Sequence, residues 1–89
     1  MCFRAVAQKE LKELGRRIRQ RRKSLGWSQE QFALEAEIDR SYVGGVERGQ
    51  RNLTFTVLCR LCAALGCDVA ALTGNLPTKS QEVSIAEGL

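Results

Sequence analysis

The sequence predicts an all-α fold of five short helices in one domain. A helix start signal recurs four times, a glycine follows four of the apolar periodic runs, and no window shows the strict apolar alternation of a strand. The length of 89 residues suits a single domain. We therefore predict helices over residues 8–25, 29–36, 40–48, 55–65 and 69–73.

The first predicted helix, residues 8–25, carries an apolar stripe and most of the positive charge. Eight of the fourteen lysine and arginine residues fall between positions 9 and 23. Such a run is either a solvated helix face or a surface that binds phosphates, and a second basic group at Arg40, Arg48 and Arg51 favours phosphates. The apolar residues that recur at helical spacing and should face the core are Leu11, Leu14, Ile18 and Leu25.

The second predicted helix, residues 29–36, follows a full set of N-terminal signals. Ser28 is the predicted N-cap, and Gln31 stands where a capping box needs its second member. Trp27 and Phe32 flank the cap with the spacing of a hydrophobic staple.

The same start signal opens the last three predicted helices. Their caps are Asp39, Thr54 and Asp68, each flanked by apolar residues at staple spacing. In the helix over residues 55–65, the predicted core stripe is Leu58, Leu61, Cys62 and Leu65. Left-handed glycines commonly end helices, and the candidates here are Gly26, Gly49, Gly66 and Gly74.

Two charged residues interrupt the apolar stripes. Arg22 follows Ile18 by four residues and Glu47 follows Val43 by four, so both lie on core-facing lines. An unpaired buried charge costs several kcal/mol. We therefore predict a partly buried Arg22–Glu47 ion pair between the first and third helices; the alternative is that both side chains reach solvent.

Composition narrows the function classes. The net charge of +4 favours a polyanionic partner, and the absence of histidine removes the commonest general base and metal ligand. No carboxylate pair, nucleophile–base set or glycine-rich phosphate loop is visible, so we predict no enzyme, no metal and no cofactor. No apolar run approaches the ~20 residues of a membrane span, and the N-terminus lacks the apolar stretch of a signal peptide. We therefore predict a cytoplasmic protein without a membrane partner.

The CxxC pair Cys59 and Cys62 suggests an alternative, a thiol-dependent metal or redox protein. Zinc needs four ligands, and neither a histidine nor a second CxxC completes a site. We expect Cys62 to be a small core residue and Cys67 to belong to the staple before the last helix.

Residues 29–48 read as two short helices joined by about three residues, with small Ala33 at their crossing, which is the helix-turn-helix arrangement. Here the sequence resembles the phage-repressor and Cro-like (XRE-type) helix-turn-helix family, from about Leu14 to Leu76. The stretch from Asp39 to Thr54 resembles its restriction–modification controller branch. The matching positions are Arg22, Gly26, Trp27, Ser28, Gln29, Phe32, Ala33, Val43, Val46, Glu47, Arg48, Gly49, Leu58, Leu61, Leu65 and Gly66.

The resemblance implies a compact lambda-repressor-like domain that binds double-stranded DNA and regulates transcription, as a repressor or a controller protein. Arg40 would read guanine in the major groove, where Ser41 and Tyr42 also face. Gln29 would hold a phosphate at the start of its helix. The recognition helix is the predicted helix over residues 40–48. The other residues with implied DNA contacts are Gly44 inside this helix and Arg48, Arg51 and Asn52 at or after its end. The alternatives are that Gln29 only starts a helix, that Tyr42 packs at the rim and that Arg51 is solvated.

The sequence departs from the family pattern at Glu37, where the family usually has glycine. A left-handed residue other than glycine costs roughly 1–2 kcal/mol, so the turn is either strained or altered. Gly44 and Gly45 lie inside the recognition helix, and each lowers helix propensity by about 1 kcal/mol relative to alanine. Either the backbone approaches DNA or another helix here, which we favour for Gly45, or direct base contacts are lost.

Family resemblance places a homodimer contact on the last helix, so that two units could bind a pseudo-palindromic operator. The predicted interface residues are Val69, Leu72 and Leu76. The alternative is that they close the core of one chain. We predict a DNA-binding domain over residues 1–76 and a tail over 77–89 that is mobile or adds to the interface.

A second possible function is the antitoxin component of a toxin–antitoxin pair, which would bind a protein partner as well as its own promoter.

Overall fold

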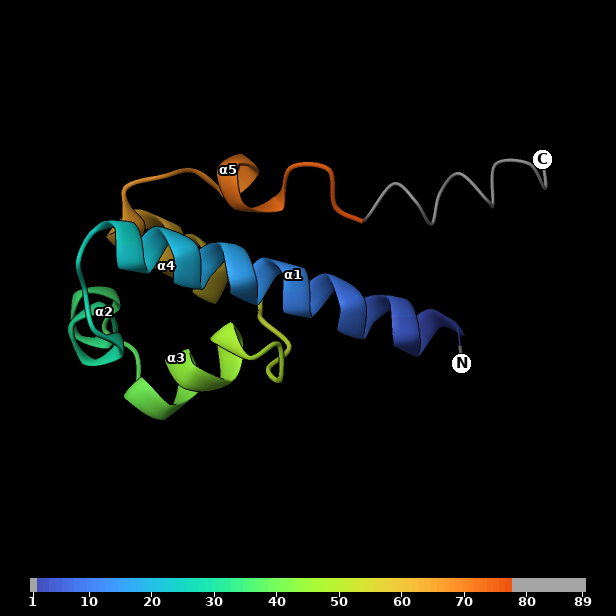
Figure 1. Ribbon diagram of the computed structural model, residues 1–89, viewed down its shortest axis with the longest axis horizontal. Coiled ribbons are helices and arrows are strands. Elements are labelled where there is room, and N and C mark those ends of the chain that lie inside the picture. The colour runs from blue at the N-terminus through green and yellow to red at the C-terminus, as the bar shows by residue number, and fades with distance from the viewer. Residues whose placement is uncertain (1, 78–89) are drawn as a thin grey trace.

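The computed structural model describes residues 2–77, with side chains from residue 8 onward, and this part of the chain is all-α, as predicted. Most of the predicted tail, residues 78–89, lies outside the described residues, so the 1–76 domain boundary stays a prediction. The helices are α1 (Cys2–Ser24), α2 (Gln29–Ala36), α3 (Arg40–Glu47), α4 (Phe55–Leu65) and α5 (Val69–Thr73) (Figure 1).

The predicted caps set the starts of the last four helices. Each cap residue has an extended backbone and accepts a hydrogen bond from a first-turn amide, with N···O distances of 2.9–3.2 Å. The rings of Trp27 and Phe32 lie 6.2 Å apart, which completes the predicted staple. Only one half of the capping box forms. The side-chain amide of Gln31 donates forward to Glu35 at 2.9 Å instead of reaching back to the cap.

The predicted bounds of the first helix are wrong at both ends. α1 begins at Cys2 instead of residue 8, because residues 2–7 contain two alanines and neither glycine nor proline to interrupt a helix. It ends at Ser24, so Leu25 lies in the turn that Gly26 closes with a φ of 76°. Leu25 is 45% exposed and does not belong to the core stripe.

The predicted stop at Gly74 also differs. Its φ is −57°, and the following Asn75 takes the left-handed conformation instead, with a φ of 65°. Asparagine tolerates this region because its short side chain can hydrogen-bond locally. The other three predicted glycines are left-handed, with φ values of 73–76°.

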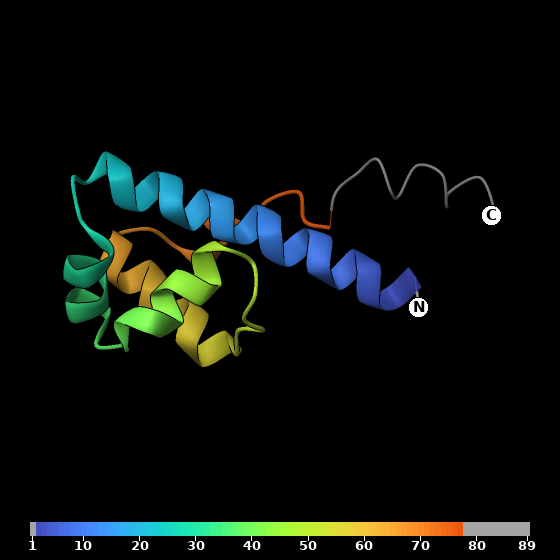
Figure 2. The same cartoon turned by 60° about the horizontal axis from the view of Figure 1, so that its bottom comes forward.

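The core lies between α1 and the layer formed by α2, α3 and α4, and α5 closes it along α1 and α4 (Figures 1 and 2). The most deeply buried large side chains come from all five helices; they are Ile18, Phe32, Val43, Leu61 and Leu72. The N-terminal half of α1 extends beyond the other helices (Figure 2). Within residues 2–77, no helix is long and apolar enough to cross a membrane.

Two glycines bring the backbones of α1 and the end of α3 into direct contact. A Cβ on Gly15 would lie 2.4 Å from the carbonyl oxygen of Val46. A Cβ on Gly49 would lie 2.7 Å from the Cα of Lys12. This close crossing fixes the position of α3 on the body of the protein.

Candidate nucleic-acid interface

The turn between α2 and α3 contains a strained residue, which is one of the two alternatives left open by the sequence. Glu37 has a φ of 58° and a ψ of 48°, and its amide donates back to the carbonyl of Leu34 at 3.2 Å. The strain is accepted because Ala33 and Ile38 fix both sides of the turn, with the Ile38 amide donating to the Ala33 carbonyl at 2.9 Å. The turn therefore keeps the helix-turn-helix geometry without glycine.

The N-terminus of α3 presents a charged side chain to solvent. The Arg40 side chain is 60% exposed, and its Nε lies 3.7 Å from the Glu30 carboxylate, a loose surface contact. Ser41 is exposed and donates its hydroxyl hydrogen bond to the Asp39 cap. The Ser41 hydroxyl and then its amide lower the pKa of Asp39. Arg40 is thus free to reach a ligand while the cap beneath it stays charged.

Tyr42 and Arg51 lie together on the outer face of α3. The Arg51 guanidinium sits 5.3 Å from the centre of the Tyr42 ring, within cation–π distance. A Cβ on Gly45 would lie only 2.8 Å from Arg51 Cγ. Gly45 therefore makes room for an arginine side chain. The side chain nearest the Gly45 backbone belongs to Arg51 and not to another helix, and the close approach of DNA at Gly45 stays a prediction.

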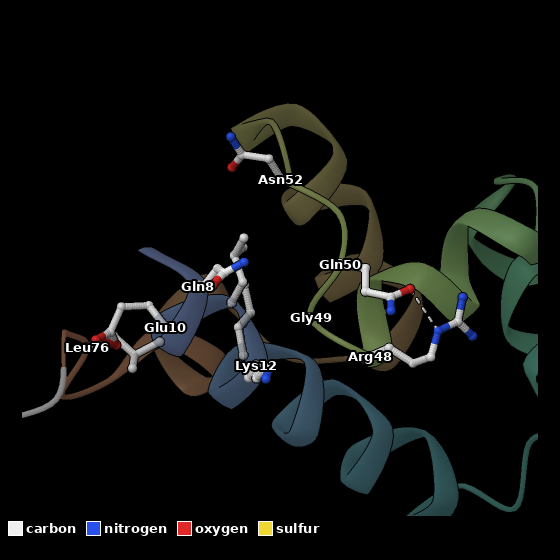
Figure 3. Close-up of a pocket in the computed structure, with 10 residues that line it drawn as sticks. Gln8, Glu10, Lys12, Arg48, Gly49, Gln50, Asn52 and Leu76 are labelled. Atoms are coloured by element: carbon white, nitrogen blue, oxygen red, sulfur yellow. Dashed lines mark hydrogen bonds between the residues drawn. The ribbon is translucent and has the colours of Figure 1, made fainter. Parts of the chain in front are cut away.

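Gly44 separates two other predicted DNA-binding side chains. A Cβ there would lie 3.2 Å from Arg48 Nη1 and 3.7 Å from Gln29 Oε1. Arg48 and Asn52 are exposed, and Arg48 Nε donates to Gln50 Oε1 at 2.9 Å (Figure 3). Gln29 is half-buried at the start of α2. We call these side chains, together with those of Arg40, Ser41, Tyr42 and Arg51, the α3 face, because they are the predicted DNA-binding residues on and around α3.

Beneath the α3 face lies the ion pair that the two interrupted stripes predict. Arg22 Nε and Nη2 donate to the two carboxylate oxygens of Glu47 at 2.6 and 3.0 Å. The side chains are 9% and 3% exposed, and Arg22 Nη1 also donates to the Trp27 carbonyl at 2.7 Å. The pair ties α1 to α3 and to the turn before α2.

Lys12 and Gln50 are not among the predicted site residues. Both line a pocket between α1 and the segment after α3, together with Arg48 and Asn52 (Figure 3). Lys12 belongs to the basic run of α1, but charge alone could not show which of its members stands beside the α3 face. In the structure, Lys12 is the member of the run that contacts Gly49, just after α3.

The predicted dimer residues separate into two groups. Leu72 is 2% exposed and completes the core of the single chain, so it has no surface to offer a partner. Val69 and Leu76 are half-buried and keep exposed apolar surface. Arg17 holds this end of the chain on α1 by donating to the carbonyls of Leu72 and Gly74, each at 2.8 Å.

The three cysteines whose side chains are described are free thiols in and after α4. Cys62 is buried in the core, and burial, followed by its neighbour Cys67, raises its pKa to about 11. Cys59 and Cys67 are half-buried. Among the described residues, no group of three or more histidine, cysteine, aspartate or glutamate side chains is arranged to hold a metal ion.

Comparison with known proteins agrees with this geometry. The helix-turn-helix family matches residues 18–72. The control protein C.SmaI of Serratia marcescens is 34% identical over 82 residues, 92% of this chain and 93% of that protein. The crystal structure of the restriction–modification controller protein C.AhdI from Aeromonas hydrophila superposes with a TM-score of 0.71 at 43% identity, covering 73% of this chain and 94% of that one.

A hypothetical transcription factor of Neisseria meningitidis is 41% identical over 56 residues, 63% of this chain, and the chain spans about half of its length (51%). The family match covers more than half of the present chain and includes both helices of the α3 face. The chain therefore belongs to the XRE-type helix-turn-helix family of DNA-binding transcriptional regulators.

Proposed function

We propose that this protein acts as a homodimer on a pseudo-palindromic operator, with the N-terminus of α3 from each subunit in the major groove. The observation that carries the proposal is the position of Arg40. Its exposed guanidinium stands at the start of an eight-residue helix, on a face flanked by Arg48 and Arg51. Recognition helices read bases through their N-terminal residues, and arginine reads guanine by a bidentate bond.

The neighbouring side chains divide the remaining contacts. Ser41 and Tyr42 face the groove, while Gln29 at the start of α2 holds a phosphate near free helix amides. Arg48, Arg51 and Asn52 bind the DNA backbone, and Gly44 allows the Arg48 and Gln29 side chains to lie close to α3. Regulation then follows from occupancy of the operator, in the cytoplasm and without a catalysed reaction.

The test of base reading is Arg40→Ala on a footprinted operator. We expect a loss of roughly 1–3 kcal/mol in operator affinity and a relaxed preference at one base pair. Arg16→Ala is the matched control, because its side chain is 59% exposed and its hydrogen bonds go to Glu13 and Gln20 on α1 itself. An equal loss on operator and random DNA would show that Arg40 binds phosphate instead.

The test of the dimer is a charge on the half-buried surface of α5. Half-sites one turn of DNA apart, about 34–36 Å, require two linked subunits. Val69→Asp should lower the dimer fraction in sedimentation and weaken operator binding, with little change in melting temperature. Leu72→Ala should instead lower the melting temperature, since Leu72 is in the core. A wild-type protein that sediments as a monomer on and off DNA would refute the dimer.

A further inference from the structure

The side chain proposed to hold a phosphate already has a partner inside the protein. Gln29 Nε2 donates to Glu47 Oε1 at 3.0 Å. The same oxygen accepts from Arg22 Nη2, and the other carboxylate oxygen accepts from Arg22 Nε. Gln29 is therefore the outer end of a chain of hydrogen bonds that begins in the protein interior.

Burial and further hydrogen bonds fix the positions of the two inner members of this chain. Arg22 and Glu47 are almost fully buried, and Arg22 is also bonded to the Trp27 carbonyl, two residues before Gln29. Within the described residues, every buried side-chain nitrogen or oxygen has a hydrogen-bond partner. A carboxylate fixed in this way offers Gln29 an acceptor at one place and in one direction.

A carboxylate only accepts hydrogen bonds, whereas a glutamine amide has one accepting and one donating end. Glu47 therefore selects the orientation in which the Gln29 NH₂ group points inward, while Gln29 Oε1 lies toward Gly44. One of the two Nε2 hydrogens binds Glu47. The second remains for another acceptor, and a phosphate oxygen is also purely an acceptor. The reversed amide would place its oxygen against the Glu47 carboxylate, and two acceptors repel each other.

We propose that Glu47 is a positioning residue for DNA binding, which orients the Gln29 amide so that it donates to a backbone phosphate. Arg22 makes this arrangement possible, because its guanidinium neutralises a carboxylate that would otherwise lie close to the DNA charge. The inference rests on the proposed phosphate contact of Gln29 and extends it to the buried ion pair, which then has a role in binding as well as in stability.

A thermodynamic cycle tests the proposal. Replacing both members of a buried ion pair by apolar residues commonly preserves folding, so the background is Arg22→Met with Glu47→Leu. In the wild type, Gln29→Ala should weaken duplex binding about tenfold, and in this background less than twofold. Arg40→Ala is the control and should cost the same in both backgrounds, because the ion pair of Arg40 is with Glu30 and not with Glu47. Equal Gln29→Ala losses in both backgrounds would overturn the positioning role.

A measurement on the wild type does not depend on a stable variant. In the free protein, one Gln29 side-chain NH₂ resonance should be shifted downfield and exchange slowly with solvent, and added duplex should shift the other. Two resonances with the values of a solvated amide would refute the Glu47 bond. Failure of the wild type to bind any duplex would instead refute the proposed function, so the two failures are distinguishable.

Discussion

At the residue scale, the two glycines of α3 let side chains from other parts of the chain lie close to its backbone. Gly45 accommodates Arg51, which lies over Tyr42, so two residues predicted to contact DNA separately act as one packed unit. The alternatives for these two residues, that Tyr42 packs at the rim and that Arg51 is solvated, each describe only part of this arrangement. Tyr42 is half-buried against the core, but its ring supports an exposed guanidinium.

Glu37 gives a prediction at the same scale. Its left-handed backbone costs roughly 1–2 kcal/mol. Glycine would remove this cost, but it also makes the unfolded chain more flexible, which offsets part of the gain in stability. We expect Glu37→Gly to stabilise the protein by about 1 kcal/mol and to raise Tm by about 4–8 °C in a thermal melt. Glu35→Gly, the same substitution in the helical part of α2, is the control and should lower Tm. A lower Tm for Glu37→Gly would mean that its side chain contributes more than its backbone costs.

At the scale of elements, the caps and the turns decide where helices begin, but contact between helices decides where they lie. The crossing of α1 and α3 requires Gly15, whose missing side chain lets the two backbones touch. Gly15 sits on the core side of an otherwise regular helix, next to Leu14. Its role is therefore packing, although in sequence it reads only as a weak helix former.

The crossing predicts opposite effects for two glycine-to-alanine changes. Gly15→Ala places a Cβ 2.4 Å from a backbone oxygen that cannot move alone, so we expect a loss of about 1–3 kcal/mol. Gly44→Ala meets only the end of the flexible Arg48 side chain at 3.2 Å, so its stability should be unchanged or up to about 1 kcal/mol higher. Urea denaturation measures both. Equal effects of the two substitutions would show that α1 and α3 can separate freely.

At the scale of the whole molecule, two arginine networks join distant parts of the chain. Arg22 links α1, α3 and the turn before α2. Arg17 links α1 to the end of α5, and Glu13 holds Arg17 through a hydrogen bond of 2.8 Å. Hydrogen bonds from Arg16 and then Arg17 lower the pKa of Glu13 from its ordinary 4.5 to about 2.

The lowered pKa predicts a pH dependence of folding. The folded protein binds the Glu13 proton more weakly than the unfolded chain does, so the stabilisation is complete above about pH 4.5 and is lost as the pH falls toward 2. Wild type should therefore lose more Tm than Glu13→Gln between pH 5 and pH 2. Glu35→Gln is the control, since Glu35 accepts from Gln31 rather than from an arginine. Parallel Tm curves for wild type and Glu13→Gln would contradict the prediction.

Much of the fold was predictable because its signals are local. A cap such as Ser28 or Thr54 bonds an amide three residues away, and a staple joins near neighbours, so both can be read from spacing. The first helix was predicted less well, because no cap marks its start and residues 2–7 simply continue it. Leu25 has the right spacing for the core, but the chain turns away before it.

By itself the sequence determined the helices, the helix-turn-helix and the family, because these depend on local periodicity and on a motif of short spacing. Only the tertiary structure decided which side chains meet. It places Leu72 in the core, brings Lys12 beside Gly49, and joins Gln29 to Glu47. Those contacts connect residues far apart in the chain, and they depend on how closely helix backbones approach, which no periodicity encodes.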